Sequence, residues 1–121
     1  MEVAHIRDAG RRAENRAVWH LRLRGWRIAA RNWTGGGGEL DIVASRWRTL
    51  LIVEVRQRMT GAQALESIDR AKLNRTMRAA QALVRAHDLQ AYQLRFDVIG
   101  VDADGRIHRR CDILRQGVLG S

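Results

Sequence analysis

Two neighbouring segments of this chain have the pattern of β-strands joined by a tight turn. They cover residues 38–44 and 50–56, are rich in β-branched residues, and the first begins within a run of four glycines. A two-residue turn at positions 47–48 would close them into an antiparallel hairpin in which Asp41 lies opposite Glu54. Because alternate residues of a strand share one face, this register decides which side chains the sheet brings together.

The hairpin register places two carboxylates in direct opposition. Asp41 and Glu54 would repel one another, whereas Glu39 would lie opposite Arg56. A divalent cation between Asp41 and Glu54 would remove the repulsion, which predicts a metal site. The same spacing also arises where solvated charges protect an exposed face or edge of a sheet, so the pattern alone leaves both interpretations open.

The remaining elements are expected to complete one domain over residues 1–121. Gly35–Gly38 is expected to be a flexible loop, which either could close over a backbone or is a plain linker. Periodicity and turn residues predict the order helix, three strands, helix and two strands, at residues 5–24, 26–33, 38–44, 50–56, 61–87, 94–101 and 106–114.

Three charged residues fall on or beside the apolar stripes of the two predicted helices. Glu14 lies at the margin of the stripe on the first helix. Lys72 and Arg75 lie on the apolar line of the second, in mid-helix. A base on such a line either extends to its rim or meets a buried negative charge, such as metal-site carboxylates or a bound phosphate.

The net charge of +9 indicates a polyanionic partner. Lys72 is the one lysine, and the other 21 of the 22 basic residues are arginines. Arginine favours nucleic acid as the partner, because its guanidinium binds phosphate in a bidentate fork and stacks on bases. A basic protein can also be merely soluble and adhesive, and the shortage of lysine also fits a codon bias.

Cysteine usage and hydropathy indicate a cytoplasmic protein without a membrane partner. The single Cys111 excludes an internal disulfide, which suits a reducing compartment. No apolar run is long enough to span a bilayer, and no signal-peptide pattern is present. The four histidines are scattered and do not have the spacing of a zinc site.

Taken together, these motifs resemble the small bacterial UPF0102 (YraN-like) proteins, which belong to the restriction-endonuclease-like, PD-(D/E)xK fold. The resemblance implies an α/β (α+β) domain with a restriction-endonuclease-like or tRNA-endonuclease-like core, in the order αβββαβ. It also implies a mixed sheet flanked by helices and an extra C-terminal strand. It covers most of the chain and rests on Gly10, Glu14 and Ala17, Gly25-Trp26, Arg31-Asn32-Trp33, Gly38–Asp41, Val53–Arg56, Arg58, Gly61, Lys72 and Arg95–Val98.

The same resemblance implies roles for the acidic hairpin. Asp41 and Glu54 match the two motif acids and would hold Mg²⁺ (or Mn²⁺), together with the backbone carbonyl of Val55. Glu14 matches a helix acid that supports the metal or a bound water. Arg56 stands where the motif has lysine, and because arginine stays charged it can orient groups or stabilise charge but cannot take a proton.

These roles imply a Mg²⁺-dependent nuclease that hydrolyses phosphodiester bonds in DNA rather than RNA. By analogy with related folds, its substrate would be branched or Holliday-junction-like DNA and its form could be a homodimer. One alternative is a non-catalytic nucleic-acid-binding module whose site is degenerate at Arg56, and another is a protein-interaction adaptor whose charge is incidental. Phosphate contacts are expected from Arg31, Arg58, Lys72 and Arg75.

Overall fold

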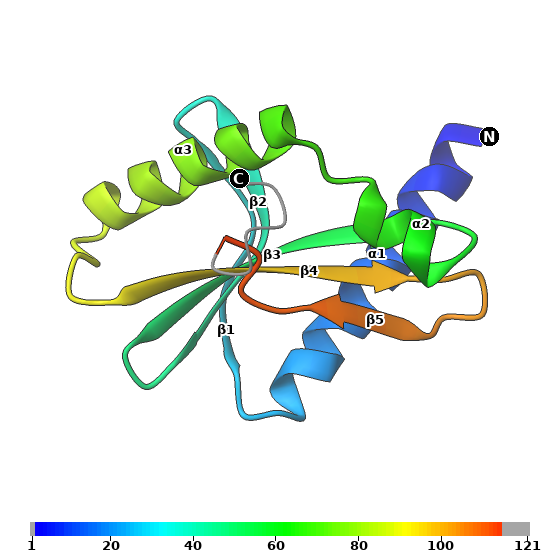
Figure 1. The fold of residues 1–121 in the computed structure, drawn as a ribbon, viewed down its shortest axis with the longest axis horizontal. Coiled ribbons are helices and arrows are strands. Elements are labelled where there is room, and N and C mark those ends of the chain that lie inside the picture. Colours follow the sequence, from blue (N-terminus) through cyan, green and yellow to red (C-terminus); the bar gives the residue numbers. More distant parts are fainter. Residues whose placement is uncertain (1, 115–121) are drawn as a thin grey trace.

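The computed structural model describes the backbone of residues 2–114 and the side chains of residues 10–114 (Figure 1). In chain order these form α1 (Glu2–Arg22), β1 (Arg27–Gly35), β2 (Gly38–Arg46), β3 (Thr49–Gln57), α2 (Gly61–Glu66), α3 (Arg70–Ala86), β4 (Gln93–Val101) and β5 (Ile107–Arg110). The predicted order of elements is confirmed, except that the second helix is split. None of the helices described is long and apolar enough to cross a membrane.

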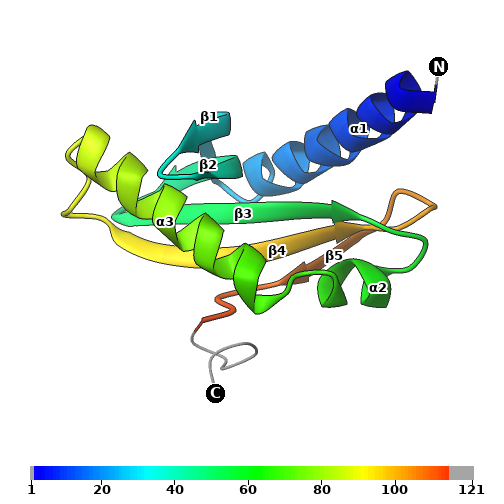
Figure 2. The same ribbon diagram turned by 90° about the horizontal axis from the view of Figure 1, so that it is seen from above.

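A five-stranded sheet in the order β1-β2-β3-β4-β5 separates two hydrophobic cores. β3 and β4 are parallel and the other neighbours antiparallel, so the sheet is mixed. Figure 2 shows α1 and α3 on opposite sides of it. Alternate strand residues divide between the cores: Ile42 and Leu51 lie under α1, and Val43 and Ile52 lie under α3. The protein is therefore an α+β fold with a mixed sheet flanked by helices.

The predicted hairpin register is confirmed in the part of the hairpin nearest its turn. Residues 47–48 form the turn, and β2 pairs with β3 from there to Ile42 and Val53. Continued by one residue, the same register sets Asp41 beside Glu54. The acid pair therefore lies immediately beyond the paired part of the hairpin.

The two strands diverge past that point, which corrects the predicted pairing of Glu39 with Arg56. In the part of the chain that the structure describes, Glu39 pairs with a residue of β1 and Arg56 with a residue of β4. The carboxylate of Asp41 accepts the backbone N–H of Val55 at 2.9 Å. A side-chain oxygen thus takes the place of a backbone carbonyl and ends the β2–β3 ladder.

Residues 61–87, predicted as one helix, form two helices that a short break separates. The hydroxyl of Ser67 donates to the carbonyl of Ala64 at 2.7 Å, where α2 ends. The carboxylate of Asp69 then accepts the backbone N–H of Lys72 at 2.8 Å and caps α3. After this restart the buried line of α3 consists of Leu73, Thr76, Ala79, Ala80 and Leu83.

The glycine-rich segment Gly35–Gly38 is a tight hairpin turn, and the flexible loop expected there is wrong. Only Gly36 and Gly37 separate β1 from β2, with φ angles of +60° and +82°. Two consecutive positive φ angles make a two-residue hairpin turn, and glycine adopts them without strain. A Cβ on Gly36 would lie 2.7 Å from the carbonyl oxygen of Arg78, so the turn packs directly against α3.

The last strand is shorter than the predicted segment of residues 106–114. β5 ends at Arg110, and Asp112 has a φ angle of +53°, which turns the chain. The backbone N–H of Asp112 donates to the buried carboxylate of Asp97 at 2.8 Å. This bond to β4 replaces further pairing along the edge of the sheet.

Candidate functional site

The acid pair lies where β2 and β3 begin to separate. The side chains of Asp41 and Glu54 interact directly, as the hairpin register predicts. Glu54 is only 7% exposed, whereas Asp41 is half-buried. The fold thus keeps two mutually repelling carboxyl groups together in a site with little access to water, which requires nearby positive charge or a proton.

Two cations share one oxygen of Glu54. The ammonium of Lys72, in the first turn of α3, lies 3.4 Å from Glu54 Oε1. The guanidinium of Arg56, on the same face of β3 as Glu54, lies 3.5 Å from the same oxygen. Of the two expectations for a base on the helix stripe, Lys72 therefore meets a buried negative charge. Arg75, one turn further along, is exposed.

The second oxygen of Glu54 is buried without a partner. Among the side chains of residues 10–114, Glu54 Oε2 and Arg56 Nε are the buried polar atoms that lack any hydrogen bond. Such an atom costs about 1–3 kcal/mol, and a cation on Glu54 Oε2 would remove that cost. The oxygen ligands fit Mg²⁺, which takes one or two carboxylates and keeps several waters.

The predicted helix acid, Glu14, lies beside the acid pair but is engaged elsewhere. Glu14 and Asp41 line one pocket of about 200 Å³. The carboxylate of Glu14 accepts hydrogen bonds from Arg31 Nε at 2.7 Å and from Asn32 Nδ2 at 3.2 Å. No group of three or more Asp, Glu, His or Cys side chains within the described residues could hold a metal ion. Asp41 and Glu54 are therefore the core of the candidate site.

The predicted phosphate contacts differ in how far they are available. Arg31 is tied to Glu14 and also donates to Asn15 Oδ1 at 2.6 Å. Arg58 and Arg75 are exposed, on the strand side and the helix side of the acid pair respectively. Lys72 is directed at the acids. Arg58 and Arg75 are thus the predicted contacts most accessible to a polyanion.

The sequence reasoning missed a second charged cluster, around Asp97 of β4. Asp97 is 1% exposed and accepts hydrogen bonds from Arg95 at 3.1 Å, Arg109 at 2.7 Å and the N–H of Asp112 at 2.8 Å. Burial alone would raise the pKa of Asp97, but these hydrogen bonds lower it below its ordinary value. The signal in the sequence is an aspartate within an otherwise apolar strand.

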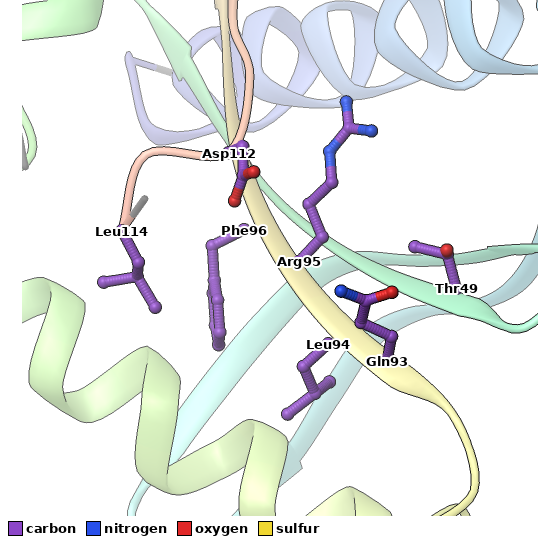
Figure 3. A pocket seen from close by; sticks show the side chains of 7 residues that line it. All are labelled: Thr49, Gln93, Leu94, Arg95, Phe96, Asp112 and Leu114. Carbon is purple, nitrogen blue, oxygen red and sulfur yellow. The ribbon is translucent and has the colours of Figure 1, made fainter. Parts of the chain in front are cut away.

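A pocket of about 480 Å³ opens beside this second cluster, at the start of β4 (Figure 3). Figure 3 shows Arg95 and Phe96 extending to opposite sides of the strand. Since Arg95 is bound to Asp97, the pocket does not present a free cation there. The unpartnered buried atoms of the described side chains lie at Glu54 and Arg56, so the acid pair remains the stronger candidate.

The protonation of the acid pair follows from its burial. Burial, together with the negative charge of Asp41, raises the pKa of Glu54 from 4.5 to about 7, against the attraction of Lys72 and Arg56. Burial also raises the pKa of Asp41, although the hydrogen bond from the Val55 N–H opposes the increase. Near neutral pH the pair therefore holds a proton that a bound cation would displace.

Replacing Glu54 with glutamine is expected to stabilise the protein at high pH. The folded state binds a proton at Glu54 more tightly than the unfolded state, so its stability falls as pH rises from 4.5 through about 7. Glu54→Gln removes this loss, and its free energy of unfolding should exceed that of the parent by about 1–3 kcal/mol at pH 8 and by little at pH 4. Urea unfolding across this pH range measures the difference.

The matched control for this experiment is Glu39→Gln. Glu39 is exposed on the same hairpin, so its replacement should leave the pH dependence of stability as it is in the parent. A Glu54→Gln variant that is less stable than the parent at pH 8 would show that the two cations outweigh the burial of the carboxylate.

Comparison with known proteins identifies relatives over most of the chain. The profile of the family described as "Uncharacterised protein family UPF0102" matches residues 13–101. The chain is 42% identical to a UPF0102 protein of Myxococcus xanthus over 104 residues, which cover 84% of this chain and 82% of that protein. It is 41% identical to one of Stutzerimonas stutzeri over 107 residues (86% and 89%), and 41% identical to one of Bacteroides thetaiotaomicron over 101 residues (82% and 83%). The chain therefore belongs to the UPF0102 family.

Proposed function

We propose that this member of the UPF0102 family is a Mg²⁺- or Mn²⁺-dependent nuclease that hydrolyses phosphodiester bonds in DNA. The observation that carries the proposal is the buried, unpartnered Glu54 Oε2 beside the side chain of Asp41. Two acids held together against their repulsion, with one oxygen left without a partner, favour a ligand site over a purely structural pair. The restriction-endonuclease-like assignment of the mixed sheet belongs to the same proposal.

Asp41 and Glu54 would hold the ion, with the backbone carbonyl of Val55 as a further proposed ligand. When bound, Mg²⁺ would lower the pKa of a bound water and neutralise charge on the phosphate. Glu14 could support the ion or its water only by leaving Arg31, with which it forms an ion pair of 2.7 Å. A phosphate that attracts Arg31 would favour that exchange.

The lysine that the motif expects at Arg56 has a substitute on α3. Lys72 is the one lysine among 22 basic residues, and its ammonium lies 3.4 Å from Glu54. Lysine can exchange a proton with a nearby water, whereas arginine keeps its charge. We therefore assign to Lys72 the orientation of the attacking water and the handling of its proton. Arg56 would stabilise negative charge on the phosphate.

The charge balance at the acid pair supports a second candidate, a non-catalytic nucleic-acid-binding module. Lys72 and Arg56 already place two positive charges at Glu54 Oε1, so a cation is not needed for neutrality. The module would keep the basic surface and bind DNA by its phosphates without hydrolysing it. The two candidates differ in whether the site binds a divalent metal.

Incubation of the purified protein with linear, nicked, flapped and four-way DNA tests the proposal. Cleavage of branched DNA is expected with Mg²⁺ or Mn²⁺, and none with EDTA. Metal should also raise the thermal unfolding midpoint of the parent and leave that of Glu54→Gln unchanged, because binding only to the folded state stabilises it. DNA binding without cleavage or a metal-induced midpoint shift would establish the non-catalytic module instead.

A further inference from the structure

The turn between β2 and β3 presents a tryptophan almost entirely to solvent. Trp47 is 93% exposed and has a φ angle of +55°. This left-handed conformation suits glycine or asparagine, which hairpin turns ordinarily use, and is disfavoured for a bulky side chain. Neither burial nor turn geometry explains a tryptophan at this position. Figure 1 shows the hairpin ending at the lower left, well away from α2 and the start of α3.

The tip that carries Trp47 is held firmly on both sides. The guanidinium of Arg46 donates to the carbonyl of Arg24 at 2.7 Å and lies 4.2 Å above the ring of the buried Trp26. On the other side, the backbone N–H of Gln93 donates to the carbonyl of Arg48 at 2.7 Å. The exposed ring therefore projects from a fixed backbone, so a ligand that binds it needs to order little of the protein.

The surroundings of the tip are basic and lack acids. The chain has no Asp or Glu between Glu14 and Glu39, or between Asp41 and Glu54. These two stretches include α1's last turns, β1 and the whole β2–β3 turn. The exposed arginines nearest the tip in sequence or strand pairing are Arg24, Arg27 and Arg48. An exposed aromatic ring among arginines, without acids, is the combination that binds bases and phosphates of a single strand.

We propose, building on the proposed function, that Trp47 stacks on an unpaired base of the bound nucleic acid while the neighbouring arginines bind its phosphates. Trp47 is six residues from Asp41 along β2, a distance of about 20 Å. The ring therefore contacts a nucleotide remote from the phosphate at the acid pair, about six steps along a strand. The substrate class becomes DNA in which a duplex adjoins unpaired bases.

Binding in EDTA to a duplex and to the same duplex with a central bubble of unpaired bases tests this inference, because no cleavage interferes. The parent should prefer the bubble, and Trp47→Asn, which suits the positive φ angle, should bind the bubble about tenfold more weakly with duplex affinity unchanged. Trp47→Phe should keep most of the preference, because it keeps an aromatic face. The thermal midpoint of Trp47→Asn should equal or exceed that of the parent.

The matched control is Leu23→Ala, which removes another exposed apolar side chain, 79% exposed, next to Arg24. It should leave the preference for the bubble unchanged. A bubble preference retained by Trp47→Asn would overturn the stacking inference, with the proposed function intact, and would assign the tip to a protein contact. Failure of the parent to bind either DNA at low salt would overturn both proposals.

Discussion

Replacing Asp41 with alanine is expected to abolish DNA cleavage, a loss of about 10³-fold or more, while leaving DNA binding largely intact. Asp41 is one of the two proposed metal ligands, and the exposed arginines that would bind phosphate do not depend on it. The alanine also removes the acceptor of the Val55 N–H, which Asp41 binds at 2.9 Å. Asp41→Asn retains an acceptor there and should lose cleavage as well, which separates chemistry from local structure.

Lys72 and Arg56 give a sharper comparison within the same assay. Lys72→Arg keeps a positive charge near Glu54 but cannot release a proton, so cleavage should fall about 10²-fold. Arg56→Lys restores the residue of the motif and should preserve or raise the rate. Cleavage by Asp41→Ala at the rate of the parent would reveal a contaminating nuclease, and the binding-module candidate would then be preferred.

The elements that depend on local sequence were predictable. The β2–β3 register follows from a two-residue turn and the alternation of strand side chains, and it places Asp41 beside Glu54 before any coordinates are known. The family resemblance is likewise carried by short motifs and is confirmed by relatives at about 40% identity. Glu14 was predicted at the margin of a buried helix face, where its half-buried position agrees.

The parts that sequence reasoning missed depend on contacts between distant segments. Lys72 reaches Glu54 from a helix that begins only because Asp69 caps it, and helical periodicity does not reveal such a break. Asp97 is neutralised in part by Arg109 from the next strand. The glycine turn was read as a loop because its packing against α3 involves residues some forty positions away. Pattern reasoning therefore located the acids but not all of their partners.

The affinity for DNA is expected to fall about 10³-fold or more between 50 and 200 mM salt. Binding that neutralises about six phosphates releases as many counterions, which sets this slope. The net charge of +9 remains available for such contacts, although Arg95 and Arg109 are consumed by Asp97. Fluorescence anisotropy at a series of salt concentrations measures the slope.

Two arginines on α3 show whether this electrostatic attraction is centred on the acid pair. Arg75 is exposed one turn beyond Lys72, and Arg85 is exposed in the last turn of the same helix, about 15 Å further along. Arg75→Ala should reduce the salt slope by about one, whereas Arg85→Ala should leave it unchanged. Equal effects of both substitutions would indicate diffuse attraction to the whole basic surface. An affinity that hardly changes with salt would remove nucleic acid as the partner and leave the protein-interaction adaptor as the better interpretation of the charge.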